Sequence, residues 1–301
     1  MQRYFFHAGK GGVGKSTTSS LTALQLARTG RRVLLVSLDP AHNQSDIFDM
    51  EFTAKPRQVA PGLSVAQADI DAWIRNWLRG IEEQVRRTYT YHTAFNLENR
   101  MNVIKHSPGL EEYALLLAFK HYRDKNPEPD VIVYDMPPTA LTTKFFNLPA
   151  LSLVWLEQLL ELRCEIMEKR KIITKIQLGK CEIECDKISS RLGKQQTFFG
   201  ELRDLFQDGA ICRIHLVVNP DRLSFAEAGR ICESLDEMRI PLAGVLMNKV
   251  GPESVWDENH VIFQRSRVHP LAQSPTPLIG LAALGAYLDA HAPDFAFAEA
   301  D

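Results

Sequence analysis

Short runs of apolar residues alternate along this chain with longer stretches that have helical spacing. The runs are rich in Val, Ile and Leu, which is typical of strands covered on both faces. They are Tyr4–Ala8, Arg31–Leu38, Met101–His106, Val131–Tyr134, Cys212–Val218 and Leu242–Met247. Helical patterns separate them, beginning with a helix expected from about Lys15 to Thr29. Strands alternating with helices predict an α/β fold with a doubly wound, mostly parallel sheet.

One long stretch contains no strand pattern. From Leu148 to Phe206, Leu, Ile, Met and Cys alternate with Glu, Lys and Arg. This pattern predicts amphipathic helices, arranged as a hairpin that breaks near Gly179 or Gly193. We therefore interpret residues 1–301 as a single domain with a helical insertion over about 148–206.

Two smaller segments complete the pattern. A second helical block is expected over about Asp71–Thr93, where Trp73, Ile74, Trp77 and Leu78 lie near helical spacing. The tail from Ala292 onward is expected to fray.

The segment between the first strand and the first helix has the spacing of a phosphate-binding loop. It reads Gly9-Lys10-Gly11-Gly12-Val13-Gly14-Lys15-Ser16-Thr17. Glycines allow the backbone to curl so that successive N–H groups point at phosphate oxygens, and the following helix directs its positive end at the same anion. Lys15 is expected to reach the β- and γ-phosphates, and Ser16 to bind Mg²⁺. A chance match occurs in roughly one chain of this length in a hundred, so we expect ATP binding and hydrolysis.

Two aspartates follow predicted strands. Asp39 comes after Val33–Leu38, and Asp135 comes after Val131–Tyr134. Either one alone could equally be a helix cap or a turn residue. Because parallel strands end at the same edge of the sheet as the phosphate loop, the pair favours a catalytic arrangement. Asp39 would then orient the attacking water, and Asp135 would hold Mg²⁺ through a water molecule.

Composition and charge exclude several classes of protein. Hydrophobic residues make up 45% of the chain and the formal net charge is −2, so no global field attracts nucleic acid. No run reaches the length of about 18 apolar residues that a membrane helix needs. The five cysteines include no Cys-x-x-Cys pair, which argues against a disulfide framework. We expect a cytoplasmic protein and leave a peripheral association with a membrane open.

Four ordered motifs resemble one family. The segment Lys10–Thr17 resembles the deviant Walker A loop of signature-lysine ATPases. Three more segments are similar to elements of the arsenite-pump and tail-anchored-protein-targeting branch. The first switch of that branch resembles Asp39-Pro40-Ala41-His42-Asn43-Gln44-Ser45-Asp46, and its second switch resembles Asp135-Met136-Pro137-Pro138-Thr139. A Pro-Gly-x-x-Glu element of the same branch resembles Pro108-Gly109-Leu110-Glu111-Glu112.

This resemblance implies a sheet of the P-loop NTPase type and a homodimer with ATP or ADP and Mg²⁺ at the subunit interface. Lys10 of one subunit would reach the phosphates of the other. The amide of Asn248 would read the adenine edge, although as a bare residue it is equally a turn former. Eukaryotic targeting relatives bind zinc through a Cys-x-x-Cys after this position. Residues 249–256 contain no cysteine, so no zinc site is expected.

Three functions follow from the resemblance. The first is a dimeric ATPase switch that opens and closes a surface for a hydrophobic client helix or a membrane partner. In this hypothesis the apolar residues of the insertion form the surface; alternatively, they pack in the core. The second is the energising subunit of a metalloid or anion exporter. Cys181 and Cys185 would share a helix face with Cys164 nearby, but we cannot match these three to a metalloid site and interpret them as free thiols. The third is a positioning or partition ATPase, which a tail without Lys or Arg over 282–300 disfavours.

Overall fold

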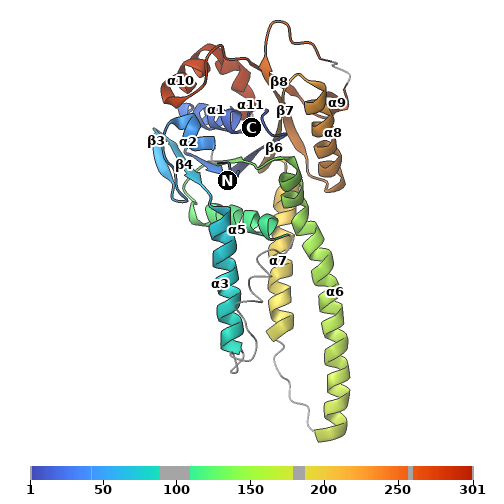
Figure 1. The fold of residues 1–301 in the computed structure, drawn as a ribbon. Coiled ribbons are helices and arrows are strands. Elements are labelled where there is room, and N and C mark those ends of the chain that lie inside the picture. The colour runs from blue at the N-terminus through green and yellow to red at the C-terminus, as the bar shows by residue number, and fades with distance from the viewer. Residues whose placement is uncertain (1, 42, 89–108, 179–186, 257–259, 300–301) are drawn as a thin grey trace.

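Eight strands form one twisted sheet in the computed structural model of the chain, in the order β3-β4-β2-β5-β1-β6-β7-β8 (Figure 1). The structure describes residues 2–41, 43–88, 109–178, 187–256 and 260–299. Neighbouring strands are parallel except β3 and β4. The strands are β1 (Arg3–Ala8), β2 (Val33–Ser37), β3 (Arg57–Ala60), β4 (Leu63–Gln67), β5 (Val131–Asp135), β6 (Cys212–Val218), β7 (Leu242–Val250) and β8 (Val268–Ala272).

Helices cover both faces of the sheet, which confirms the predicted doubly wound α/β fold. The helices are α1 (Lys15–Arg28), α2 (Asn43–Phe48), α3 (Ile70–Thr88), α5 (Leu110–Lys125), α6 (Thr139–Leu178), α7 (Lys187–Gln207), α8 (Arg222–Glu237), α9 (Val261–Arg265), α10 (Gly280–His291), the 3-10 turn η2 (Ala292–Phe295) and α11 (Ala296–Glu299). Neighbouring residues of β1 point to opposite faces. Phe5 packs in the cluster that contains α1, and Phe6 in the cluster that contains α5 to α8.

An aromatic cluster fixes the long helices onto the sheet. Phe6 stacks on Tyr134 with ring centroids 5.0 Å apart. Phe119 of α5, Phe145 of α6 and Phe206 of α7 surround this pair with centroid distances to Phe6 of 5.8, 6.2 and 6.1 Å. Buried aromatic side chains contribute a large apolar area each, so the bases of α5, α6 and α7 are held to the centre of the sheet.

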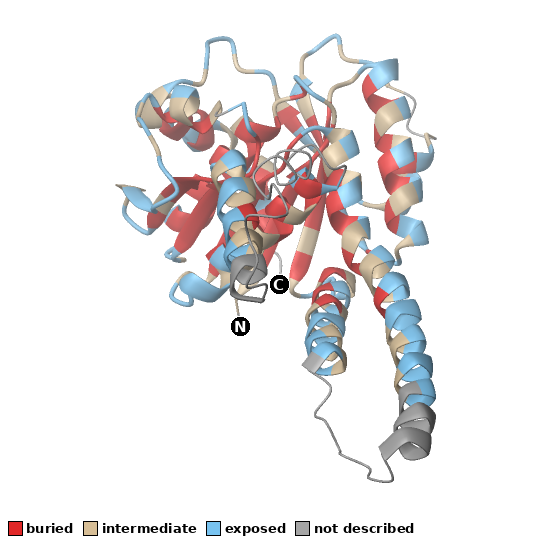
Figure 2. Cartoon of the chain, turned by 60° about the horizontal axis from the view of Figure 1, so that its bottom comes forward, coloured by how far each residue is buried: buried red, intermediate tan, exposed pale blue. Residues whose placement is uncertain are grey.

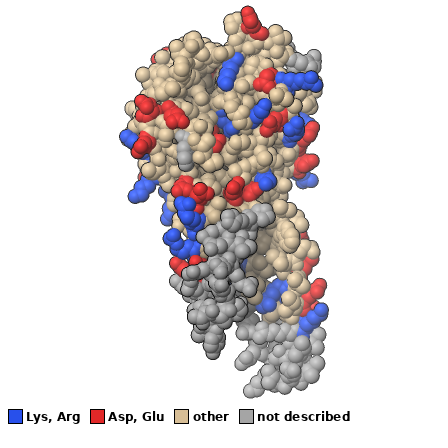
Figure 3. Space-filling model, in the orientation of Figure 1, with Lys and Arg blue, Asp and Glu red and all other residues tan. Residues whose placement is uncertain are grey.

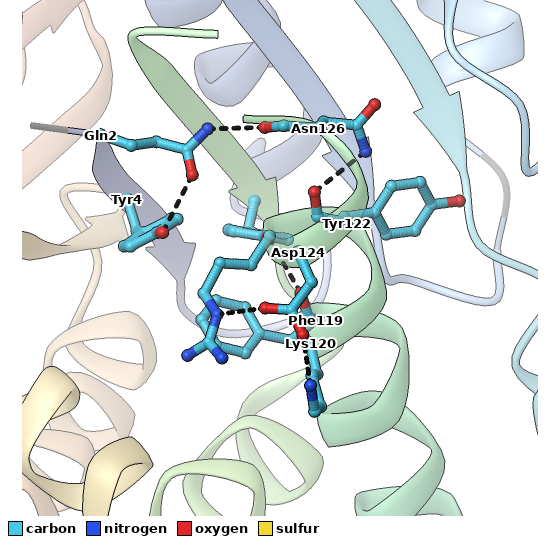
Figure 4. A network of polar contacts seen from close by, with 9 residues as sticks. Gln2, Tyr4, Phe119, Lys120, Tyr122, Asp124 and Asn126 are labelled. Carbon is cyan, nitrogen blue, oxygen red and sulfur yellow. Dashed lines mark hydrogen bonds and ion pairs between the residues drawn. The ribbon is translucent and has the colours of Figure 1, made fainter. Parts of the chain in front are cut away.

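A polar network ties the start of β1 to the end of α5 (Figure 4). Gln2 Nε2 donates to the carbonyl of Asn126 at 2.8 Å, and Tyr4 Oη donates to Gln2 Oε1 at 3.0 Å. Asn126 Nδ2 in turn donates to the carbonyl of Tyr122, at 2.9 Å. This last contact satisfies one of the carbonyls that a helix end leaves without a partner.

The helices α3, α6 and α7 extend away from the sheet as a helical projection (Figure 1). In Figure 2 the parts of α6 and α7 next to the sheet carry buried residues, and the parts farther away are largely exposed. α6 runs without interruption from Thr139 to Leu178, through Pro149. The expected insertion boundary at Leu148 therefore lies inside a helix.

Several expectations about the elements need correction. Gly193 lies inside α7, so the hairpin does not break there, and the alternative break near Gly179 lies outside the described residues. Over its described residues, 292–299, the tail does not fray: η2 and α11 form there, and Phe295 and Phe297 are buried. The strands β3, β4 and β8 were not expected, because they are short and interrupted by polar residues or proline. The strand predicted over 101–106 lies outside the described residues.

Candidate functional site

The phosphate loop connects the central strand β1 to α1, and its glycines are required by its backbone. Gly9 has φ 152°, and a Cβ there would lie 2.4 Å from the carbonyl oxygen of Val217. Gly14 has φ 94°, and its Cβ would lie 2.3 Å from Asn248 Nδ2. Side chains of L residues disfavour positive φ, and these contacts leave no room for a Cβ. The loop therefore has a conformation that only glycine fits at these two positions.

Lys15 begins α1 and is almost completely buried, with 5% exposure. Its Nζ donates to the carbonyl of Lys10 at 3.3 Å, so the side chain folds back over the loop. Burial lowers the pKa of Lys15, while Asp135 and Asp39 act in the opposite direction. The structure thus brings Lys15 and both predicted aspartates together.

Asp135, the last residue of β5, is fully buried. Burial raises its pKa to about 6, although hydrogen bonds from Ser16 and Gln44 lower it. Asp135 Oδ2 accepts from Gln44 Nε2 at 3.0 Å, whereas Asp135 Oδ1 has no hydrogen-bond partner. An unpartnered buried carboxylate oxygen beside a serine hydroxyl is suited to a hard cation with oxygen ligands. Ser16 and Asp135 could hold such an ion.

Asp39 lies two residues beyond β2 and is 5% exposed. Its Oδ1 accepts from the backbone N–H of Ala41 at 3.0 Å, which fixes the turn that leads into α2. Asp39 therefore caps a turn, and it also lines a cavity beside the phosphate loop. A turn contact through one oxygen leaves the other free for a water molecule.

A cavity of about 670 Å³ opens beside the loop at the carboxyl edge of the sheet. From the loop and α1 it is lined by Gly11, Gly12, Gly14, Lys15, Ser16 and Thr17. Asp39, Pro138 and Asn248 also line it, together with residues 272–274 and 278–279. Lys10 is half-buried and Val13 packs in the core, so neither side chain is part of the lining.

Asn248 lies within β7, and not after its last residue as predicted. Its Nδ2 donates to the carbonyl of Val13 at 2.7 Å, which joins β7 to the phosphate loop. The next residue, Lys249, has φ 58°, and its Nζ lies 3.4 Å from the carbonyl of Gly12. The sequence analysis did not identify Lys249 as a residue of the site. Its position directly after the candidate Asn248 could have indicated that it lies there.

The second switch leads directly into α6. Pro138 lines the cavity, and α6 begins at the next residue, Thr139. Thr142 Oγ1 donates to the carbonyl of Pro137 at 2.6 Å and closes the first turn. The structure therefore connects the cavity to the helical projection through a continuous helix.

The Pro-Gly-x-x-Glu element has a defined contact with this switch. Gly109 precedes α5 with φ 89°, and Glu112 of α5 is almost fully buried. Glu112 Oε1 pairs with Lys144 Nζ of α6 at 2.9 Å. This ion pair raises the pKa of Lys144 and joins α5 to the first turns of α6.

In this site a phosphate-binding loop joins a central parallel strand to a helix, and carboxylates lie at the ends of neighbouring strands. This arrangement defines the class of P-loop nucleotide hydrolases. Sequence comparison gives the family. The model of the anion-transporting ATPase family matches residues 2–270, and the chain belongs to this family. The predicted enzyme class, an ATPase, is thereby confirmed.

Several curated proteins are similar over most of the chain. An arsenical pump-driving ATPase 2 of Aquifex aeolicus is 30% identical over 259 residues, which are 85% of this chain and 83% of that protein. The ATPase GET3 of Komagataella phaffii is 29% identical over 82% of this chain and 73% of its own length. The ATPase ASNA1 homolog of Plasmodium falciparum is 29% identical, and there the chain spans 62% of the relative's length.

No helix in the described part of the chain is long and apolar enough to cross a membrane. The cysteines of the described residues are dispersed. Cys164 is exposed on α6, and Cys212 and Cys232 are buried in the sheet domain. The prediction that Cys181 and Cys185 share a helix face lies outside the described residues.

Proposed function

We propose that this ATPase is a Mg²⁺-dependent homodimeric switch that couples ATP binding and hydrolysis to the helical projection, on which a hydrophobic client helix or a membrane partner protein docks. Lys15 binds the phosphates, Asp39 orients the attacking water, and Asn248 contacts adenine. Ser16 holds Mg²⁺ directly and Asp135 holds it through water. When bound, the ion neutralises phosphate charge. The unpartnered Oδ1 of Asp135 supports this assignment.

The observation that carries the coupling is the junction of the second switch with α6. Pro138 contacts the nucleotide cavity, and α6 extends from Thr139 without a break for 40 residues. Proline restricts the backbone, so a displacement of this segment would be transmitted as a rigid rotation and not absorbed by local melting. The pair of Glu112 and Lys144 supports the same idea, because it makes α5 follow the motion.

The docking surface in this proposal is the exposed stripe of α6, formed by Leu151, Val154, Trp155, Leu159, Leu162 and Ile166. These residues repeat at three- and four-residue spacing, so they share one side of the helix. Val154 and Trp155 are 60% and 65% exposed, which is unusual for residues of their size. The alternative expectation was that the apolar residues of the insertion pack in the core. It is wrong for these exposed side chains, but it holds for Leu156, which is 6% exposed.

The charge pattern supports a protein or hydrophobic partner in place of nucleic acid. On the face seen in Figure 3, Lys and Arg side chains are interspersed with Asp and Glu. A surface of mixed sign produces no extended positive field on that face. We propose a cytoplasmic protein that acts at a membrane only through its partner.

Substitutions of Lys15 and Asp39 test the roles proposed for them in phosphate binding and hydrolysis. Lys15→Ala should weaken ATP binding by about ten- to a hundredfold, because a charged hydrogen bond to phosphate is lost. Asp39→Asn should keep ATP affinity within about threefold and lower the turnover rate by at least a hundredfold. Binding of a fluorescent ATP analogue and phosphate release measure the two quantities. Wild-type turnover in Asp39→Asn would remove the water-orienting role.

The coupling has its own test. Limited proteolysis of the helical projection should differ between the ATP-bound and nucleotide-free protein. Replacing Glu112 by Gln should reduce this difference while ATP affinity stays unchanged. If nucleotide leaves the cleavage of α6 and α7 unaltered in the wild type, the coupling proposal is wrong even if the chain hydrolyses ATP.

The second candidate, the energising subunit of a metalloid or anion exporter, is favoured by the name of the Aquifex relative. It shares the ATP chemistry and differs in the partner. Purification from the native host distinguishes the two, since an exporter subunit should co-purify with an integral membrane channel and a targeting factor with diverse hydrophobic helices.

A further inference from the structure

Gln44, in the first turn of α2, is a fully buried polar side chain at the centre of the site. Its Nε2 lies 3.0 Å from Asp135 Oδ2, 3.2 Å from the carbonyl of Ser16 and 3.2 Å from Ser19 Oγ. Its Oε1 accepts from Ser20 Oγ at 2.6 Å. One side chain thus joins the first switch to the phosphate-loop helix and to the end of β5.

The orientation of the amide is determined by its neighbours. Asp135 Oδ2 as a carboxylate and the carbonyl of Ser16 can only accept, so they must face the NH₂ group. The opposite orientation would place Gln44 Oε1 against these two oxygens. Because an amide nitrogen has two hydrogens, three acceptors compete for them, and the bond to Asp135 is the shortest of the three.

The consequence for Asp135 is that its two oxygens have different tasks. Oδ2 is occupied by Gln44, and Oδ1 is buried without a hydrogen-bond partner. A carboxylate that is held at one oxygen cannot rotate freely, so the other oxygen has a fixed direction. Groups that orient the residues around a metal typically change its affinity by 10- to 100-fold when they are removed.

We propose that Gln44 is a positioning residue for Mg²⁺: its amide holds Asp135 Oδ2 and the Ser16 carbonyl in place, so that Asp135 Oδ1 and the Ser16 hydroxyl are presented together to the ion and its water. This inference rests on the proposed role of Ser16 and Asp135. The inference adds Gln44 to the residues that support the metal site. Gln44 belongs to the first switch, carries no charge and does not line the cavity itself.

The test separates metal binding from nucleotide binding in the full chain. Affinity for a fluorescent ATP analogue is measured in EDTA and then with increasing Mg²⁺, for the wild type, Gln44→Leu and Gln44→Asn. Leu removes the amide at similar volume, and Asn keeps the amide but shortens it by one methylene. We expect the affinity in EDTA to stay within about twofold, and the Mg²⁺ concentration for half-maximal effect to rise about tenfold.

Ser45→Ala is the matched control. It removes a hydrogen bond from the next residue of the same helix, from Ser45 Oγ to Gln67 Oε1 at 3.0 Å, without touching Asp135 or Ser16. Its Mg²⁺ dependence should match the wild type. If Gln44→Leu does not fold, Gln44→Asn decides the question, because it leaves the polarity of the site intact.

Two results would overturn the proposal. An unchanged Mg²⁺ dependence in a folded Gln44 variant removes the positioning role. A parallel loss of affinity in EDTA and with Mg²⁺ indicates a general structural role. Asp135→Asn is included as the reference: if it fails to shift the Mg²⁺ dependence, the metal assignment is wrong, and this failure is distinct from that of Gln44.

Discussion

Burial shifts the pKa of two groups of polar side chains that lie on the central sheet or beside it. Lys15 and Asp135 lie at the phosphate loop, where burial shifts the pKa of each, and opposite charges and hydrogen bonds act against this shift. A second group is a row of histidines, His7 on β1, His215 on β6 and His269 on β8, behind the site. The rings of His7 and His215 stack at 5.6 Å, and Phe297 lies 5.0 Å from both His215 and His269.

The histidine row should make the fold sensitive to acid. Burial lowers the pKa of His7 from 6.5 to about 3, and it lowers that of His215 well below the usual value, helped by His7, His269 and Arg213. At a pH between the lowered pKa values and 6.5, the unfolded chain binds more protons than the folded chain. The free energy of unfolding therefore falls as the pH falls through this range. At pH 5.5 the loss relative to pH 8 is about 1 kcal/mol for each of the two fully buried histidines, His7 and His215.

Urea unfolding at pH 8 and pH 5.5 measures this effect. His215→Phe removes one titrating group from an aromatic environment, since Phe5 and Phe297 both contact that ring. The variant should match the wild type at pH 8 to within about 1 kcal/mol and lose less stability on acidification. The same pH dependence in both proteins would show that His215 does not titrate in this range.

At the scale of elements, α6 has two different apolar sides. Leu156 packs against the main core, and its neighbour Trp155, about 100° further around the helix, is exposed. An aspartate at position 156 would be buried without a partner, which costs several kcal/mol. An aspartate at position 155 would face water.

Adjacent substitutions therefore have opposite outcomes. Leu156→Asp should lower the free energy of unfolding by about 3 kcal/mol or more, whereas Trp155→Asp should change it by less than about 1 kcal/mol. Trp155→Asp should instead abolish binding of a hydrophobic helix peptide in the presence of ATP. Thermal unfolding and peptide anisotropy are the measurements. A large loss of stability in Trp155→Asp would mean that this side of α6 packs within the protein.

At the scale of the whole molecule, the proposed homodimer depends on Lys10. In the single chain its backbone carbonyl accepts from Lys15, and its side chain is not part of the cavity lining. A lysine of the loop that does not line its own cavity is consistent with action on the other subunit. Such a contact with phosphate could contribute about 1–3 kcal/mol to the closed dimer, enough to shift its equilibrium tenfold or more.

Mixed dimers test this arrangement. Lys10→Ala should leave ATP affinity of a single subunit nearly intact and abolish most hydrolysis. When Lys10→Ala is mixed with Asp39→Asn, one site of the heterodimer combines an intact Asp39 from one chain with an intact Lys10 from the other, and partial activity should return. Heterodimers that form but remain as inactive as each variant alone would exclude action between subunits.

The distribution of cysteines leads to a prediction about metalloids. Burial raises the pKa of Cys232 to about 11 and raises that of Cys212 further, so both stay protonated, and thiols in this state are poor ligands. The other three cysteines, Cys164, Cys181 and Cys185, have a spacing that we cannot match to a metalloid site. Arsenite or antimonite should therefore not stimulate hydrolysis under reducing conditions, as phosphate release will show. A several-fold stimulation that disappears in Cys181→Ser would contradict this expectation and favour the exporter.

The sequence by itself determined the nucleotide loop and the class of fold. The loop residues are consecutive, and their function depends on local backbone conformation, which Gly9 and Gly14 specify directly. The strands β1, β2, β5, β6 and β7 were predictable, because fully buried parallel strands need continuous apolar runs. The short strands β3, β4 and β8 lack this signal, since β3 is exposed and β8 contains Pro270.

Only the tertiary structure decided which distant residues meet and which apolar residues remain exposed. Gln44 and Asp135 are 91 positions apart, and Asn248 and Val13 are 235 apart. Their contacts follow from the order of strands in the sheet, which local pattern does not specify. Likewise, Trp155 and Leu156 are both apolar residues of one helix, and only the position of that helix beside the sheet places one in water and the other in the core.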